Sequence, residues 1–235
     1  MAEAPYQPKD RRPIAARRWP IWQHMAKWMA HQGVSPNAIS LAGMGCGMAA
    51  GLALAATGSA GGAERFAWLA GAALIQLRLL ANLLDGMVAI ESGRASAVGE
   101  LYNEVPDRVS DTAVLVGAGY AVGGDIVLGY LAACAALFTA YVRTMGKAAG
   151  APQEYCGPMA KQQRMALLTV VALYCGLTPA AWQPTWGWWD GFQNPPTSGG
   201  QGLAAAVLLV ITLGSLFTAI RRLMRIAANL RRGRP

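Results

Sequence analysis

Charged residues and metal-binding side chains are scarce in this chain of 235 residues. Only 14% of the residues are charged, whereas a soluble domain carries about a quarter. The chain has two histidines and four cysteines, and the cysteines lack the spacing of a metal site. These shortages argue against a soluble fold, and we expect the cysteines to be small, buried apolar side chains.

A cleavable targeting segment is also missing from the start of the sequence. Residues 1–20 are polar and basic, with no apolar core and no cleavage site, so we expect no removed signal peptide. His24 and His31 lie one heptad apart near this end, and we expect them at the membrane interface rather than as metal ligands.

Apolar residues, by contrast, make up 54% of the chain and arrive in long blocks. A helix needs about 20 residues to cross the hydrocarbon of a membrane, because each residue rises only about 1.5 Å. Many Ala and Gly residues within the blocks suit close helix packing in lipid. We expect an all-α, polytopic integral membrane protein with about six transmembrane helices. The six blocks are 38–57, 64–90, 107–122, 126–144, 165–182 and 202–226.

The cations of the chain gather on one side of this arrangement. Arg and Lys cluster before the first block, after the last block, and at the second and fourth loops, whereas the three opposite loops contain essentially Arg65 alone. By the positive-inside rule, both termini and the even-numbered loops face the cytoplasm, and we expect the bacterial inner membrane as the location. This bias accounts for the net charge of +8, so no nucleic-acid partner is expected.

Three segments follow from this topology. Residues 1–37 form a cytoplasmic N-terminal segment, in which basic residues mixed with tryptophans at 17–28 indicate an amphipathic interfacial helix. Residues 38–226 form the six-helix transmembrane domain, in which we expect the chemistry to lie. Residues 227–235 form a basic cytoplasmic tail.

Acidic residues concentrate in one short stretch of the chain. Asp85 lies near the cytoplasmic end of the second apolar block, where an ionisable side chain is costly unless it faces a wet cavity or a cation. The stretch holds half of all Asp and Glu residues, which are Asp85, Glu91, Glu100, Glu104, Asp107 and Asp111.

This stretch presents two polar helix faces. The first carries Asn82 and Asp85, and the second carries Asn103, Asp107 and Asp111 at every fourth position. If the two faces meet across a cytoplasmic cleft, their carboxylate and amide oxygens would form a site for a hard divalent cation such as Mg²⁺.

A purely structural role for these acids is the alternative. Arg78 and Arg108 would neutralise the buried acids, and Asn103 would cap a helix. That interpretation leaves Gly86 and Gly99 unexplained, because ion pairs do not require small residues beside them.

The spacing of these residues is similar to that of a known family. From Asn82 to Asp107 the chain reads N-x2-D-G-x2-A-I-x8-G-x3-N-x3-D in one-letter code. This stretch resembles the signature of the CDP-alcohol phosphotransferase family, D-x2-D-G-x2-A-R-x8-G-x3-D-x3-D, with every spacing kept. The chain length, the number of apolar blocks, an N-terminal cytoplasmic helix and the Pro36-Asn37 lead-in also suit that family.

The resemblance implies an enzyme of phospholipid biosynthesis. Such an enzyme moves a substituted phosphate, such as a phosphatidyl group, from a CDP-linked donor like CDP-diacylglycerol to an alcohol, and releases CMP. Asp107 would be the base that deprotonates the alcohol, and Asp85 would bind the metal. Mg²⁺, or Mn²⁺ in its place, would stabilise the charge on the diphosphate.

The same resemblance assigns the remaining residues of the site. Small residues would let the nucleotide lie against the backbone, with the Asn82 side-chain amide next to it. The expected nucleotide-binding residues are Asn82, Gly86, Ala89 and Gly99. The expected metal ligands are Asn82, Asp85, Asn103, Glu104, Asp107 and Asp111.

The chain departs from the family signature at three positions. Asn82 and Asn103 replace the first and third aspartates, and Ile90 replaces the arginine. Two negative charges are therefore missing, so the affinity for two divalent ions should fall, and binding of one ion or of two is left open. Glu100, Glu104 and Asp111 would restore charge from nearby positions on the same predicted helix. These departures also leave open a catalytically inactive relative.

The fourth loop carries the cations expected to bind phosphate. Arg143, Lys161 and Arg164 would hold an anionic acceptor or the donor phosphate, although ordinary positive-inside charge explains them equally well. The acceptor is thus left open between a neutral alcohol and a polyol phosphate. Arg78 or Arg94 would take the place of the missing motif arginine.

Two other classes of membrane protein compete with this interpretation. The run from Asn103 to Asp111 resembles the first aspartate-rich motif of intramembrane prenyltransferases, which bind a prenyl diphosphate through magnesium, but no second such motif is present. An ion or proton-coupled transporter would also place acids in the membrane, but it predicts symmetric halves that are not evident. The small-residue third and fourth blocks permit a homodimer.

Overall fold

The computed structural model describes residues 15–187 and 200–233, and this part of the chain is largely helical. The α-helices in it are α1 (Pro20–His31), α2 (Pro36–Ala55), α3 (Glu64–Glu91), α4 (Ala97–Tyr120), α5 (Ile126–Ala148), α6 (Lys161–Leu177) and α7 (Leu203–Arg231). Short 3-10 turns are η1 (Ala15–Arg18), η2 (Ala56–Ser59), η3 (Gly61–Ala63) and η4 (Ala180–Trp182). Two short strands, β1 (Thr185–Trp186) and β2 (Gln201–Gly202), pair antiparallel, with Thr185 opposite Gly202.

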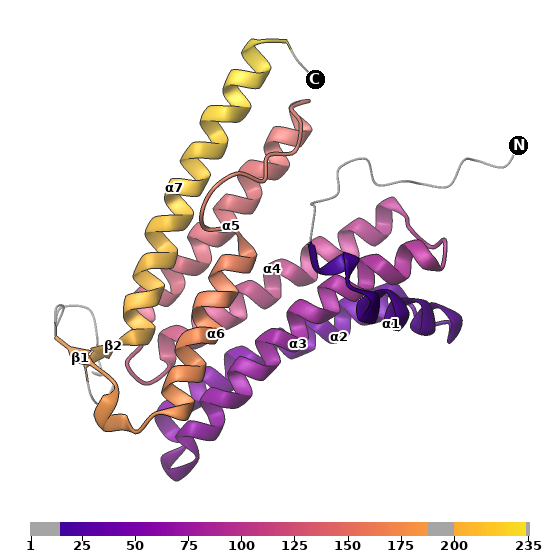
Figure 1. Cartoon of the computed structure of the whole chain (residues 1–235). Helices are drawn as coiled ribbons and strands as arrows, with labels where there is room; N and C mark the ends of the chain where they lie inside the picture. The colour runs from indigo at the N-terminus through magenta and orange to yellow at the C-terminus, as the bar shows by residue number, and fades with distance from the viewer. Residues whose placement is uncertain (1–14, 188–199, 234–235) are drawn as a thin grey trace, which may run out of the picture.

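The long helices form two groups that diverge from a common base. Figure 1 shows α2, α3 and α4 leaning to one side, while α5 and α7 rise on the other and α6 stands between them. Helix α2 packs against α3 and α4, α5 packs against α7, and α3 packs against α6. The largest buried cluster lies where the groups meet and includes Trp68, Leu115 and Leu208. The base is therefore closed by apolar packing.

Glycines permit the closest helix contacts at this base. A Cβ atom on Gly117 of α4 would lie only 2.1 Å from the carbonyl oxygen of Gly51 in α2. A Cβ atom on Gly129 of α5 would likewise lie 2.9 Å from the Cα atom of Gly119 in α4. These contacts agree with the expectation that small residues bring the helices together in lipid.

Four of the helical stretches have the length and composition of membrane spans. Within the described residues, four stretches are long and apolar enough to cross a membrane: Pro36–Ser59, Gly61–Glu91, Ile126–Ala148 and Leu203–Arg231. Helix α4 falls outside this set because its first half is polar, and α6 has only 17 residues. The chain is an all-α, polytopic membrane protein, and its count of six spans stays a prediction.

Two of the predicted blocks have the wrong bounds. The third was expected at 107–122, but α4 begins at Ala97, because the Ser96 hydroxyl accepts a 3.0 Å hydrogen bond from the Gly99 amide and caps the helix. Asn103 lies inside α4, as the predicted helix face requires and not as the cap that the structural alternative suggested. The fifth block was expected to reach 182, but α6 ends at Leu177, because Thr178 precedes a proline and adopts an extended conformation.

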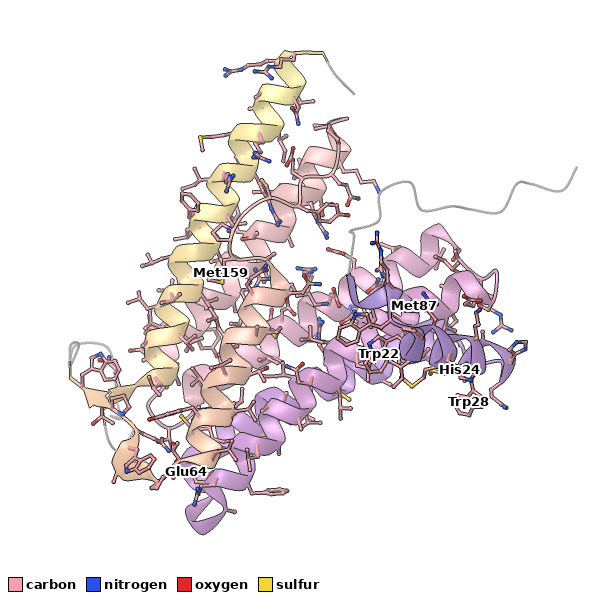
Figure 2. The ribbon with its side chains drawn as sticks, viewed as in Figure 1. Trp22, His24, Trp28, Glu64, Met87 and Met159 are labelled. Carbon is pink, nitrogen blue, oxygen red and sulfur yellow. The ribbon has the colours of Figure 1, made fainter. Side chains whose placement is uncertain are left out.

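The N-terminal helix α1 has the character of a surface helix. One residue, Ala26, is fully buried in it, whereas Trp19, Ile21 and Trp28 are more than half exposed. Trp22 packs against a buried cluster that includes Met87 of α3. In Figure 2, Trp22 lies close to the body of the protein, and Trp28 points away from it. This division fits a helix that lies along the membrane surface.

The expectation for the cysteines is only partly right. Cys175 is buried in α6, whereas Cys46 and Cys156 are half-buried and Cys134 is exposed on α5. An exposed position on a membrane helix can face lipid, where a small apolar side chain needs no burial by protein.

Candidate active site

A cavity of about 1490 Å³ lies between the two diverging groups of helices. Its walls include residues of α2 to α7 and of the segment before α1. Leu77, Leu80 and Leu101 give part of the lining an apolar character, while polar and charged residues of α3, α4 and the start of α6 line the rest. The cavity can therefore hold a molecule with one apolar and one polar part.

Helix α3 contributes the first polar face of the cavity. Asn82, Asp85, Gly86 and Ala89 all line it, as their shared helix face predicts. Asp85 is 2% exposed, and its Oδ2 atom accepts a 2.6 Å hydrogen bond from the Ser40 hydroxyl of α2. Its Oδ1 atom accepts from the Gly86 amide at 2.5 Å. The carboxylate is thus held in place by two neutral donors.

Helix α4 contributes the opposite face, and the two faces touch. The Asn82 amide nitrogen donates to Oδ1 of Asp107 at 2.5 Å and to Oδ1 of Asn103 at 3.2 Å. Gly99, one turn before Asn103, also lines the cavity. Residues that lie more than twenty positions apart in the sequence therefore form one polar surface, as the motif spacing predicts.

Asp107 is paired with cations on both of its oxygens. Arg78, which is 1% exposed, lies 2.9 Å from Oδ1, and the Lys161 ammonium lies 2.6 Å from Oδ2. Arg78 also donates to the Asn82 amide oxygen, and Lys161 donates to the same oxygen at 3.0 Å. The ion pairs that the sequence suggested as a structural alternative are thus present at the cavity wall.

Asp111 lies deeper than its predicted role requires. It is 2% exposed, it is absent from the cavity lining, and it lies 3.1 Å from Arg78 and 3.3 Å from Arg164. Arg164 also donates to the backbone oxygen of Met159, whose side chain packs against Gly214 of α7. Figure 2 labels Met159. Arg164 lines the cavity and, through Asp111, ties α6 to α4 at the cavity floor.

Arg108 pairs with two acids of its own helix. Its guanidinium lies 3.1 Å from Glu104 and 3.8 Å from Asp107, so Glu104 is the closer partner. Glu104 also pairs with Arg143 of α5, and the Arg143 guanidinium lies 5.6 Å from the centre of the Tyr155 ring. These residues form the rim of the cavity, where Glu104 joins α4 to α5.

Several residues of the cavity carry no signal in the sequence. Ser40 and Tyr155 line it from α2 and from the loop before α6, and Arg222 reaches it from α7. Arg17 of η1 lines it as well, and burial lowers the pKa of its guanidinium, against the opposing effect of the negative charge on Asp85. Their distance along the chain from the motif explains why local spacing could not identify them.

The residues proposed to replace the motif arginine have different surroundings. Arg78 is buried among the acids, as described above, whereas Arg94 lines the outer part of the cavity and donates to the Gly33 backbone oxygen at 3.3 Å. Ile90, at the arginine position of the motif, is 47% exposed and lines the cavity too. Of these two arginines, Arg78 is therefore the one in contact with the aspartates.

The oxygen atoms of the site suit one hard cation. Within residues 15–187 and 200–233, no three His, Cys, Asp or Glu side chains are grouped closely enough to enclose a metal ion. Asp85 and Asp107 line the cavity together with the amides of Asn82 and Asn103, and a third carboxylate of the lining, Glu104, is paired with Arg108 and Arg143. Mg²⁺ is commonly bound through about one or two carboxylates plus substrate phosphates, so this donor set fits an ion that arrives with a diphosphate.

Known proteins match the sequence of this chain over most of its length. No protein-family model matches it. The phosphatidylinositol phosphate synthase of Streptomyces avermitilis is 27% identical over 86% of this chain and 75% of its own. An inner membrane protein of Escherichia coli is 24% identical over 68% and 79%.

Solved structures with the same fold come from Mycobacterium tuberculosis. Its phosphatidylinositol phosphate synthase with CDP-DAG bound has a TM-score of 0.67, covering 88% of this chain and 94% of that one at 20% identity. The same protein in complex with manganese and citrate has a TM-score of 0.65, at 20% identity, covering 87% and 88%. These structures agree with the helical membrane fold described above.

A third relative decides the family. The archaetidylinositol phosphate synthase of Aeropyrum pernix is 32% identical over 163 residues, which cover 68% of this chain and 70% of that protein. The match extends over many more residues than the motif, so the sequence identity does not come from the motif alone. With the motif spacing and the touching polar faces of α3 and α4, this identity shows that the chain is a transferase of the CDP-alcohol phosphatidyltransferase family.

Proposed function

We propose that this chain transfers a phosphatidyl group from CDP-diacylglycerol to a phosphorylated polyol and releases CMP. The observation that carries the proposal is the contact between Asn82 and Asp107, which joins the two motif halves at the wall of one large cavity. A relative of the same fold contains CDP-DAG, and we propose the same kind of donor here.

The two parts of such a donor match the two kinds of cavity wall. Acyl chains would enter along the apolar lining near Leu77 and Leu80. The cytidine diphosphate would lie over Asn82, Gly86, Ala89 and Gly99, as proposed from the motif. Small side chains at three of these positions would let the nucleotide approach the backbone closely.

A divalent cation, Mg²⁺ or Mn²⁺, is proposed to assist the reaction. A structural relative is described with manganese, and the oxygen donors of this site fit one such ion. Asp85 and Asp107 would hold it, with Asn82 and Asn103 as neutral oxygen donors and Glu104 at the rim. Asp111 would act from beneath the site, through Arg78. When bound, the ion supplies positive charge to the diphosphate and to the departing CMP.

The residues of the chain would perform the remaining steps. The acceptor hydroxyl would lie against Asp107, which takes its proton as the oxygen attacks the phosphorus of the phosphatidyl group. A new bond forms between that oxygen and the phosphorus, and the phosphorus–oxygen bond to CMP breaks. Arg78 and Lys161 would keep the carboxylate of Asp107 oriented, because both contact it directly.

An inositol phosphate is the proposed class of acceptor. Two relatives have names that place an inositol phosphate in their products. Arg143, Lys161 and Arg164 remain the proposed phosphate-binding cations. Arg143 is the most accessible of them, with 21% of its side chain exposed against 2% for Arg164. We therefore propose that Arg143 contacts the acceptor phosphate and that Arg164 supports it from behind.

The proposed placement in the membrane follows the charge pattern. Both termini and the cavity would face the cytoplasm, and the membrane would be a bacterial inner membrane. The segments proposed are 1–37 as the interfacial part, 38–226 as the catalytic domain and 227–235 as a basic tail. A homodimer through the small-residue faces of α4 and α5 is proposed as well.

A CMP-release assay tests the activity directly. The purified protein would be given CDP-diacylglycerol with Mg²⁺ and, in turn, inositol phosphate, glycerol phosphate, inositol and serine. We expect release with inositol phosphate above the other acceptors, and loss of release when EDTA is added. Release with inositol alone would contradict the phosphorylated acceptor. An absence of CMP with every acceptor would identify an inactive relative.

A further inference from the structure

The Lys161 ammonium occupies a central position in the candidate site. It lies 2.6 Å from Oδ2 of Asp107 and 3.0 Å from the amide oxygen of Asn82, and its side chain is only 16% exposed. Lys161 is the first residue of α6, so it reaches the motif from a different helix than either partner. The ammonium thus bridges the first and last polar positions of the motif.

Cations outnumber carboxylates around this bridge. The acids of the site and its floor are Asp85, Glu104, Asp107 and Asp111, and the cations paired with the last three are Arg78, Arg108, Arg143, Lys161 and Arg164. The affinity of an oxygen site for a divalent cation rises with the number of charged ligands it offers. Acids that are already paired with cations therefore offer little negative charge to metal ions.

Geometry also excludes a metal ion from the place of the ammonium. Mg²⁺ requires oxygen ligands at about 2.0–2.1 Å, so an ion between Asn82 and Asp107 would meet the ammonium at short distance. Like charges at such separation repel strongly in a partly buried site. Either the ammonium or a divalent ion can fill this position, but not both.

We infer that Lys161 serves as a built-in cation of this site, in place of a metal ion between Asn82 and Asp107. The protein then binds a single divalent ion on the Asp85 side of the site, together with the diphosphate of the donor. Asn82, whose amide oxygen accepts from Lys161, is then not a ligand of that ion, which narrows the donor set proposed above. This inference rests on the proposed function, because it concerns the same reaction. It also gives a reason for Asn82, since a neutral amide oxygen suffices as a partner for an ammonium.

Manganese titration of the full-length protein tests this role without measuring turnover. The free Mn²⁺ signal in electron paramagnetic resonance would be followed with and without CDP as the diphosphate probe. We expect wild-type protein to bind one Mn²⁺ per chain when CDP is present, and very weakly without it. Lys161→Met should bind Mn²⁺ without CDP at least about tenfold more tightly, because a repelling charge is gone.

Two further variants make the comparison specific. Lys161→Arg keeps a cation at the position and should titrate like the wild type. Lys27→Met removes an exposed lysine of α1 and should also leave the titration unchanged. Thermal unfolding would confirm that each variant is folded, and the wild-type stoichiometry alone decides the matter if Lys161→Met does not fold.

Several results would overturn the inference. Two Mn²⁺ ions per wild-type chain would do so, as would tight binding without CDP. An unchanged affinity in folded Lys161→Met would show that the ammonium does not compete with the metal. A failure of the proposed function is separate, because it would show as absent CMP release while the Mn²⁺ titration still reports on Lys161.

Discussion

Asp107 is the residue on which most contacts of the site converge. Replacing Asp107 by Asn keeps the shape of the side chain but removes its charge and its capacity to take a proton. We expect CMP release to fall by about 10²–10⁴-fold, the usual contribution of a general base. The assay is CMP release under saturating donor and acceptor.

The matched control for this change is Glu91→Gln, which removes an exposed acid at the end of α3. It should keep near wild-type turnover. Because Arg78 and Lys161 lose a charged partner in Asp107→Asn, thermal unfolding should accompany the assay. A folded Asp107→Asn variant with near-normal turnover would show that Asp107 is not the base.

Asn82 and Asn103 are the positions where this chain has less negative charge than its motif predicts. Restoring Asp at both should lower the Mg²⁺ concentration that supports half-maximal CMP release, because two carboxylates are added beside the site. The measurement is a Mg²⁺ titration of the rate. A higher or unchanged Mg²⁺ requirement would argue that neither amide faces the ion.

At this scale, the sequence predicted partners that share a helix face and missed those that come from elsewhere. The spacing of Asn82, Asp85 and Asp107 placed them on two faces that do meet. The contact of Ser40 with Asp85 spans 45 positions, and that of Lys161 with Asp107 spans 54. Such contacts depend on how helices pack, and no local periodicity records that.

Among the elements, the close approach of α2 and α4 sets the position of the second motif face. Gly51 and Gly117 touch backbone to backbone, so a side chain on either has no space. We expect Gly117→Leu to destabilise the protein by about 1–3 kcal/mol or more through overpacking. It should also lower CMP release, because α4 carries Asp107. Unfolding in detergent and the CMP assay would measure both effects.

Gly45 provides the control for this prediction. It lies on the same helix as Gly51, but a Cβ atom there would meet nothing within 4 Å. Gly45→Leu should therefore unfold like the wild type. Equal stability of the two leucine variants would show that the α2–α4 contact tolerates a side chain.

Hydropathy predicted the apolar helices better than the polar one. The blocks at 38–57, 64–90, 126–144 and 202–226 each overlap an observed helix closely. The start of α4 was missed because its first half is too polar to be counted as a span, although Ser96 caps it at Ala97. The functional part of a helix was thus the part that its hydropathy concealed.

For the whole molecule, the charge pattern predicts its orientation in the membrane. Green fluorescent protein fused to the C-terminus should fluoresce in bacterial cells, since the basic end of α7 is expected in the cytoplasm. Alkaline phosphatase fused there should be inactive, whereas the same enzyme inserted at 58–63 should be active. The opposite pattern of activities would invert the topology and place the cavity on the outer face.

The overall class of the molecule was predictable because a membrane restricts it so strongly. Only helices and closed barrels satisfy their backbone groups in lipid, and long apolar blocks then indicate helices. The divergence of α2–α4 from α5–α7, which creates the cavity, was not predictable. It depends on which glycines face which helix, as Gly51 and Gly117 illustrate.

The ion pairs of Arg78, Lys161 and Arg164 with Asp107 and Asp111 also bear on how the protein is made. Ionised side chains are costly to bring to membrane depth unless each finds an opposite charge. Here the newly inserted helices can supply those partners to one another. Assembly of the enzyme would then be independent of the magnesium supply of the cell, so that a chain made in a metal-starved cell is already folded when metal and lipid donor return.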